Sequence, residues 1–553
     1  MQDLIKRLMD RQKVRTEADV QADIRQFLLT APLSLSEGDI ENIVLESPLG
    51  DRRRIDIELG SAVIEVKRDL RSGKTKDEAI NQLAGYVETR TNQTGRRYVG
   101  ILSDGAEWLC FNLSAGKLHQ VSDITIRNAE DDLPRLLAWV EGVLATAQNI
   151  SPTANEIAAR LGAGSSSHAL DRATLLILYN ENKNLPSIKM KRGLWTRLLT
   201  STLGTQFDDT DELFVEHTLL VNSAEIIAHA VIGIDVKQID PARLLAGETF
   251  IDSGIYGVVE QDFFDWVIEL NRGQEFARSL ARRLARFDWG SVNQDVLKVL
   301  YESIIGTETR KRLGEYYTPD WLAEAVVEEA VQQPLQERVL DPACGSGTFL
   351  FHAIKKYIST AVRHDVPVPQ IIQGITKSIF GMDLHPVAVT FARVTYILAI
   401  GRDFLTHPER GTIHIPVYLG DSVQWEEQAT DLWSADNLVV QVEDNRELFT
   451  AELRFPEILL SNAYVFDQLV QSMADMASNR QPGSKVPSMS PVFRRLGIQQ
   501  ASHQTVEHTF RIMCSLHDQG RDHIWGYYVR NLARPMWLTR LANRVDVLGP
   551  VVA

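Results

Sequence analysis

The stretch Val339-Leu-Asp-Pro-Ala-Cys-Gly-Ser-Gly-Thr-Phe349 decides how the surrounding chain folds. Its apolar start predicts a short strand, Arg338–Asp341, and a helix is predicted from Gly347 to Ser359. Gly345 and Gly347 allow a tight turn and a close approach of the backbone to a ligand. The order strand, glycine-rich turn, helix is typical of Rossmann-like binding loops. The full GxGxxG and GxxxxGK patterns are absent, which disfavours dinucleotides and nucleoside triphosphates.

Strand and helix patterns continue to alternate beyond this stretch, which predicts a parallel α/β sheet. A second strand is expected at Ile379–Asp383, a second helix at Pro386–Ile400 and a third strand at Ile415–Gly420. Asp383, at the end of the second strand, suits the ribose hydroxyls of a nucleoside. Asp421 follows the third strand and is a candidate partner for an adenine amine.

Upstream, Gly314-Glu-Tyr-Tyr-Thr-Pro319 precedes a predicted helix and is expected to close over a bound cofactor. Together these motifs resemble the amino-methyltransferases of DNA, specifically the adenine N6 class with motif order X, I, II, III, IV. Tyr317-Thr-Pro319 matches motif X and Asp341–Phe349 matches motif I, while Asp383 and Asp421 match the acidic residues of motifs II and III. The resemblance implies a Rossmann-like fold, S-adenosylmethionine as cofactor and adenine in double-stranded DNA as methyl acceptor. The residues it assigns to cofactor binding are Tyr317, Thr318, Pro319, Asp341, Pro342, Ala343, Gly345, Gly347, Phe349, Asp383 and Asp421.

The family also has a fourth motif, (D/N/S)-P-P-(Y/F/W), which accepts hydrogen bonds from the adenine amine and stacks on the flipped base. Two places compete for it. Ser461-Asn-Ala-Tyr464 resembles it loosely but lacks both prolines. Arg544–Leu548 is typical of the fourth strand, yet Gly549-Pro550-Val-Val-Ala553 follows it. We favour the second place and hypothesise a truncated or frame-changed restriction–modification protein that binds the cofactor but has lost methyl transfer.

A second constellation lies near the N-terminus, around a hairpin turn predicted at Gly60-Ser61. Strands are predicted on either side of the turn, at Arg54–Leu59 and Ala62–Val66. Asp56 lies on the first side, and Glu65 and Lys67 lie on the second. Because Glu65 and Lys67 are two residues apart on a strand, they point to the same face of the sheet. Two carboxylates and a lysine that converge at a hairpin suit Mg²⁺, which prefers one or two carboxylates plus waters and phosphate oxygens. Thr16 is a predicted helix N-cap with Asp19 in capping-box position, and Glu17, in the first turn of that helix, is a further candidate carboxylate.

This pattern resembles the PD-(D/E)xK nuclease superfamily over roughly residues 10–120. Asp56, Glu65 and Lys67 match its core motif, and Gln82 with Tyr86 fits the Gln-x-x-x-Tyr element on a helix predicted over 76–89. The resemblance implies that Asp56 and Glu65 hold Mg²⁺ and that Lys67 assists phosphodiester hydrolysis. All five residues are therefore candidate nuclease residues.

The overall composition is that of a globular, multidomain protein. The chain has 553 residues, of which 44% are hydrophobic and 24% charged, with a formal net charge of −15. This acidity argues against a non-specific DNA coat, although basic groups gathered in one cleft remain compatible with a DNA enzyme. Three scattered cysteines form neither a disulfide framework nor a zinc motif, and no apolar run reaches the roughly 18 residues of a membrane span. We therefore expect a cytoplasmic protein without membrane association.

The expected fold is multidomain α/β, with a nuclease-like domain at 1–145, a helical connector at 146–300 and a methyltransferase domain at 301–553. The last contains a helical or loop insertion at about 426–540. The motifs indicate a type IIG-like restriction–modification protein that joins adenine methylation to Mg²⁺-dependent DNA cleavage. Three alternatives stay open: a nuclease that keeps a remnant cofactor sensor, a non-catalytic DNA-binding subunit that needs a partner, and a methyltransferase of RNA or protein. The sequence leaves open a recognition subunit and a homo-oligomer.

Overall fold

The computed structural model groups its helices and strands into two compact units. The first unit draws on residues 1–181, 278–288 and 299–306, and the second on 182–277, 289–298 and 307–553. This division differs from the three expected domains, because the predicted connector 146–300 is shared between both units. The structure describes residues 2–11, 15–31, 44–48, 54–59, 62–94, 98–114, 116–128, 132–144, 150–203, 209–290, 292, 295–306, 310, 318–420, 437–443, 450–456, 458–459, 463–478, 480–481 and 483–518.

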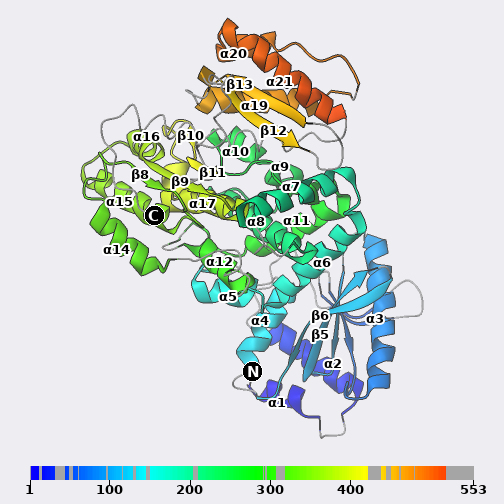
Figure 1. The fold of residues 1–553 in the computed structure, drawn as a ribbon. Coiled ribbons are helices and arrows are strands. Elements are labelled where there is room, and N and C mark those ends of the chain that lie inside the picture. Colours follow the sequence, from blue (N-terminus) through cyan, green and yellow to red (C-terminus); the bar gives the residue numbers. More distant parts are fainter. Residues whose placement is uncertain are drawn as a thin grey trace. The chain divides into compact units, whose positions relative to one another are not determined.

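The first unit is built on a six-stranded sheet in the order β1-β2-β3-β4-β5-β6 (Figure 1). Neighbouring strands are antiparallel, except that β3 and β4 are parallel and helix α3 joins them. Two strands have the bounds that the sequence predicted, Arg54–Leu59 and Ala62–Val66. The strands are β1 Val44–Pro48, β2 Arg54–Leu59, β3 Ala62–Val66, β4 Val99–Ser103, β5 Glu107–Ser114 and β6 Lys117–Thr125.

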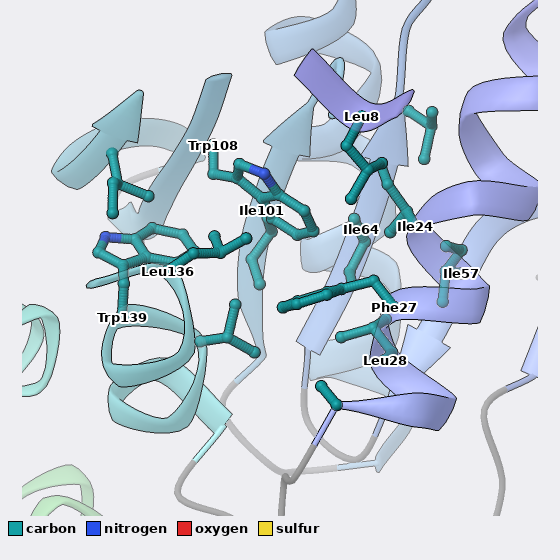
Figure 2. Packing of buried hydrophobic residues seen from close by; sticks show 14 of the residues in the cluster. Leu8, Ile24, Phe27, Leu28, Ile57, Ile64, Ile101, Trp108, Leu136 and Trp139 are labelled. Atoms are coloured by element: carbon teal, nitrogen blue, oxygen red, sulfur yellow. The ribbon is translucent and has the colours of Figure 1, made fainter. Parts of the chain in front are cut away.

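Helices cover both faces of this sheet, and all five residues of β3 are buried, the carboxylate of Glu65 among them. On one face, Ile57 and Ile64 pack with α1, α2 and α4, where Phe27 meets Trp108 edge to face at 6.0 Å (Figure 2). On the other face, Val63 packs with α3. The helices of this unit include α1 Gln2–Met9, α2 Glu17–Thr30, α3 Gly73–Thr94, α4 Asp132–Leu144, α5 Ala154–Leu161 and α6 Ser166–Asn182.

The second unit contains the predicted parallel sheet, in the order β11-β9-β8 among the described residues (Figure 1). Its strands are β8 Val339–Asp341, β9 Ile379–Asp383 and β11 Val417–Leu419, and β9 has the predicted bounds. Helix α17, Pro386–Ile400, also has the predicted bounds, and all of its residues are buried. The other helices of this part are α14 Asp320–Ala330, α15 Thr348–Arg363, α16 Val368–Ser378 and α18 Arg402–Leu405.

Part of the predicted connector packs directly on this sheet's helices, since α8, Asp211–Val231, lies against α17. A short parallel pair joins β7, Ile255–Tyr256, to β10, Ile413–His414. The predicted connector therefore contributes to the core built around this parallel sheet. The remaining elements of this unit are α7 Pro186–Leu203, α9 Pro241–Leu245, α10 Glu248–Asp252 and the 3₁₀ helix η2 Asp265–Glu269. Two further helices, α11 Asn271–Leu284 and α12 Val296–Ile304, are each divided between the two units.

The described part of the predicted insertion contains strands as well as helices. An antiparallel hairpin pairs β12, Asn437–Glu443, with β13, Thr450–Pro456. Leu453 and Phe455 point from β13 into a core shared with three helices. This alternation of buried residues is the strand signal that the helical expectation missed. The helices are α19 Ala463–Ser478, α20 Ser490–Leu496 and α21 Gln500–Asp518.

Candidate functional site

The glycine-rich turn after β8 has the backbone that its two glycines permit. Gly345 and Gly347 have φ angles of +52° and +93°, in the region that L side chains rarely adopt. A Cβ on Gly347 would lie 3.1 Å from the Cα of Ala392 in α17. Gly347 directly precedes α15, so the turn delivers the chain to a helix N-terminus packed against a neighbouring helix.

Asp383, at the end of β9, holds this turn. Its Oδ2 accepts a 2.8 Å hydrogen bond from the amide of Gly345, and its Oδ1 accepts one of 2.8 Å from the amide of His385. The sequence predicted a ribose ligand at this position. In the structure both carboxylate oxygens accept from backbone amides. Burial raises the pKa of Asp383.

Asp341 carries a buried oxygen without a partner among the described residues. Its Oδ1 accepts from the amide of Ala343 at 3.3 Å, while its Oδ2 is buried and meets no hydrogen-bond donor in the part of the chain that the structure describes. Burial raises the pKa of Asp341 to about 7, and the nearby Asp383 carboxylate adds to this rise. An unsatisfied buried acceptor is unfavourable, so a ligand that supplies a donor here would be stabilised.

The other predicted cofactor residues are only partly described. Ala343 is exposed at the tip of the turn, and Pro342 and Phe349 beside it are half-buried. Pro319 caps the N-terminus of α14. Tyr317 and Asp421 lie outside the described residues, as do Gly60-Ser61 and Arg544–Ala553. Of the other candidate for the fourth motif, Ser461-Asn462 is not described, and α19 begins at Ala463.

Asp295 is a site residue that the sequence reasoning missed. It immediately precedes α12, and its carboxylate accepts from the hydroxyls of Ser346 and Thr348 in and after the glycine-rich turn, at 2.5 and 2.9 Å. Lys298, one turn later, donates to the carbonyl of Thr318. A polar residue before an apolar helical run signals an N-cap. Nothing in the spacing, however, relates Asp295 to residues 51 and 53 positions away.

The nuclease-like residues converge in the first unit. The amide of Val66 donates to Oδ2 of Asp56 at 2.8 Å, which ties Asp56 to the strand that carries Glu65. Lys67 Nζ lies 2.5 Å from Oε1 of Glu65 and 3.2 Å from Oε1 of Glu17. Two strands and the first turn of α2 therefore bring together three carboxylates and one ammonium group.

Glu65 is fully buried, and its Oε2 has no hydrogen-bond partner within the described ranges. Burial raises the pKa of Glu65 to about 7, and the charge of Asp56 adds to the rise against the opposing effect of Lys67. On α3, the amide nitrogen of Gln82 donates to the Tyr86 hydroxyl at 2.7 Å. Burial raises the pKa of Tyr86, and both carboxylates contribute to this rise, so the helix faces the cluster.

Within the described ranges, no three or more His, Cys, Asp and Glu side chains are grouped so as to hold a metal ion. Those ranges also include no helix with the length and hydropathy of a membrane span.

Comparison with known proteins finds a family match, and it includes the glycine-rich turn. Residues 292–405 match the family model described as N-6 DNA Methylase, a segment that includes Asp295, the glycine-rich turn and Asp383. Together with the relatives below, this match supports an N6-adenine DNA methyltransferase domain of restriction–modification systems.

The relatives are restriction–modification proteins. The type I restriction enzyme MjaIX methylase subunit of Methanocaldococcus jannaschii is 26% identical over 190 residues, which are 34% of this chain and 29% of that protein. The EcoEI methylase subunit of Escherichia coli is 29% identical over 126 residues, 22% of this chain and 25% of that protein. The chain thus spans less than a third of either relative. A cryo-electron microscopy structure of a DrdV–DNA complex covers 76% of this chain and 40% of that one at 14% identity, with a TM-score of 0.29, too weak a likeness to carry an argument.

Proposed function

We propose that this protein transfers a methyl group from S-adenosylmethionine to the N6 atom of adenine in double-stranded DNA, as part of a restriction–modification system. The hypothesis that the chain has lost methyl transfer is the alternative, and the transfer assay described below decides between the two. The observation that carries the proposal is the turn between β8 and α15, held by Asp383 and flanked by the unsatisfied Oδ2 of Asp341, within the segment that matches the methylase family.

The residues present fit this cofactor. S-Adenosylmethionine carries hydroxyl, amine and ammonium donors, and Asp341 offers a buried acceptor without a partner. The absence of a side chain at Gly345 and Gly347 lets the ligand approach the backbone. When bound, the cofactor supplies an electrophilic methyl group. Asp341 and Asp383 would hold it. Thr318 and Pro319 are further candidates among the described residues, and Asp421 stays a candidate from the sequence.

Methyl transfer from labelled S-adenosylmethionine to DNA of mixed sequence, without Mg²⁺, tests the proposal. We expect label in the DNA that is recovered as N6-methyladenine after hydrolysis. A folded protein that binds the cofactor but labels no DNA would contradict transfer by this chain. Adding a recognition or methylase subunit from the same system then tests the alternative of a subunit that depends on a partner. Label in RNA or protein instead of DNA would move the proposal to a different acceptor.

A second candidate function is Mg²⁺-dependent DNA cleavage by the first unit. The unsatisfied Oε2 of the buried Glu65, beside Asp56 and Lys67, favours it. Mg²⁺ keeps several waters and needs only one or two protein carboxylates, so Asp56 and Glu65 would hold it and Lys67 would orient the attacked phosphate or water. The donor set is a hard-oxygen set, which fits this ion.

Nicking of supercoiled plasmid with and without Mg²⁺ tests this function. We expect nicking by the wild-type protein and none by Lys67→Ala. The matched control is Lys74→Ala, which removes the same charge from an exposed position on α3. Equal loss in both variants would show that Lys67 has no special role, and metal-independent nicking would point to a contaminant.

A further inference from the structure

Asp295 accepts hydrogen bonds from several residues near the candidate cofactor site. The side chain is buried, with 3% exposure. Its Oδ2 accepts from Ser346 Oγ at 2.5 Å and from Thr348 Oγ1 at 2.9 Å. Its Oδ1 accepts from the Lys298 amide at 3.0 Å and from Thr395 Oγ1 on α17 at 3.3 Å. One carboxylate thus links three elements: the start of α12, the turn before α15 and helix α17.

The two oxygens serve different purposes. The bond from the Lys298 amide to Oδ1 is the bond that an N-cap residue makes to the third residue of its helix. The bonds from Ser346 and Thr348 to Oδ2 leave the helix and reach the glycine-rich turn. Hydrogen bonds to an ionised acceptor are stronger than neutral ones, so a buried carboxylate fixes these hydroxyls firmly.

The same helical turn also reaches the other side of the predicted pocket. The Lys298 ammonium group donates to the carbonyl of Thr318, in the segment that leads into α14. The first turn of α12 therefore contacts both the glycine-rich turn and the segment expected to close over the cofactor. No residue of this turn belongs to the motifs predicted to touch the cofactor.

We propose that Asp295 is a positioning residue of the cofactor site: through Ser346 and Thr348 it holds the glycine-rich turn in its binding geometry. The inference rests on the proposed function for its link to S-adenosylmethionine. Its effect on the turn itself is independent of any ligand. Asp295 acts through other residues and does not touch the reacting atoms.

The variant that separates positioning from helix capping is Asp295→Asn. Asparagine caps helices about as well as aspartate, so its Oδ1 can keep the bond from the Lys298 amide. Its amide nitrogen replaces Oδ2 and donates where the carboxylate accepted, so the hydroxyls of Ser346 and Thr348 lose their shared acceptor. The matched control is Asp262→Asn, since Asp262 is also 3% exposed, lies in the same unit and caps the Phe264 amide.

Hydrogen–deuterium exchange without ligand gives the first readout. We expect faster exchange in Asp295→Asn over residues 343–351 and unchanged exchange in Asp262→Asn, at similar melting temperatures. Unchanged exchange over this segment in Asp295→Asn would overturn the inference, whether or not the protein binds S-adenosylmethionine. A wild-type protein that binds no S-adenosylmethionine would instead count against the proposed function alone.

Calorimetric titration with S-adenosylmethionine gives the second readout. We expect the Kd to rise about tenfold in Asp295→Asn, the effect of losing one charge-assisted hydrogen bond. Thr348→Val should weaken binding in the same direction, and Thr348→Ser, which keeps the hydroxyl, should restore it. In the double variant Asp295→Asn/Thr348→Val, the loss of binding free energy should be smaller than the sum of the two single losses, because both substitutions remove the same hydrogen bond. Full additivity, or a Kd equal to that of the wild type, would contradict the inference.

Discussion

The amide of Gly345 donates a 2.8 Å hydrogen bond to Oδ2 of Asp383, across 38 positions of sequence. The acidic residue at the end of β9 therefore holds the glycine-rich turn that follows β8. A second bond, from the Cys344 amide to the Met382 carbonyl at 2.9 Å, runs alongside it. The two predicted cofactor motifs thus form one connected structure.

Asp383→Asn should weaken cofactor binding by at least about tenfold. The amide nitrogen of asparagine would face one of the two backbone amides that now donate to the carboxylate, and an unsatisfied buried donor costs about 1–3 kcal/mol. Calorimetric titration with S-adenosylmethionine measures the change. Asp262→Asn, which alters a buried carboxylate that accepts from the Phe264 amide, away from the glycine-rich turn, is the control. Equal affinity in Asp383→Asn and the wild type would contradict the assigned role.

Gly347→Ala should lower the melting temperature more than Gly497→Ala does. Both glycines have positive φ angles, +93° and +65°, so alanine costs about 1–2 kcal/mol of backbone strain at each. Only at position 347 would the new Cβ also press on a neighbouring backbone, 3.1 Å from the Cα of Ala392, whereas Gly497 has open space. Thermal melts of the two variants measure the difference. Equal melting temperatures would show that the packing against α17 is loose.

The stability of the ligand-free protein should depend on pH through Asp341. Its pKa is raised from 3.8 to about 7 in the folded state, so the folded protein holds a proton that the unfolded chain has lost between these values. Stability therefore falls as the pH rises from about 4 to about 7, by an amount on the order of a few kcal/mol. Asp341→Asn removes this group. Its melting temperature relative to the wild type should be higher at pH 8 than at pH 5, and a difference independent of pH would contradict the raised pKa.

Glu65→Gln should stabilise the metal-free protein at pH 8 and abolish any stabilisation by Mg²⁺. The pKa of Glu65 is raised from 4.5 to about 7, so its ionisation opposes folding above that pH by about 3 kcal/mol. A divalent cation would offset this penalty by neutralising the carboxylate. Melting curves with and without MgCl₂ measure both effects. The exposed Glu88 on α3 provides the control Glu88→Gln, in which the response to Mg²⁺ should match the wild type.

Much of the local structure could be predicted from sequence. Strands β2, β3 and β9 and helix α17 have the predicted bounds, because apolar periodicity and turn residues are local signals. Thr16 caps α2 with Asp19 in the capping-box arrangement that their spacing indicated. The hairpin β12–β13 differs from the helices and loops expected there, because its strands are defined by pairing with each other and by the burial of Leu453 and Phe455.

The residue types needed for the candidate sites are visible in the sequence: the glycines that permit the turn, the acidic residues at the strand ends, and the paired Glu65 and Lys67. Folding in three dimensions sets which of these groups are buried away from water and which hydrogen-bond partners they contact. Burial leaves Asp341 and Glu65 each with an unsatisfied oxygen, and long-range packing brings Asp295 to Ser346. Hydrogen bonding and desolvation depend on what packs against a side chain, and sequence spacing carries no record of that.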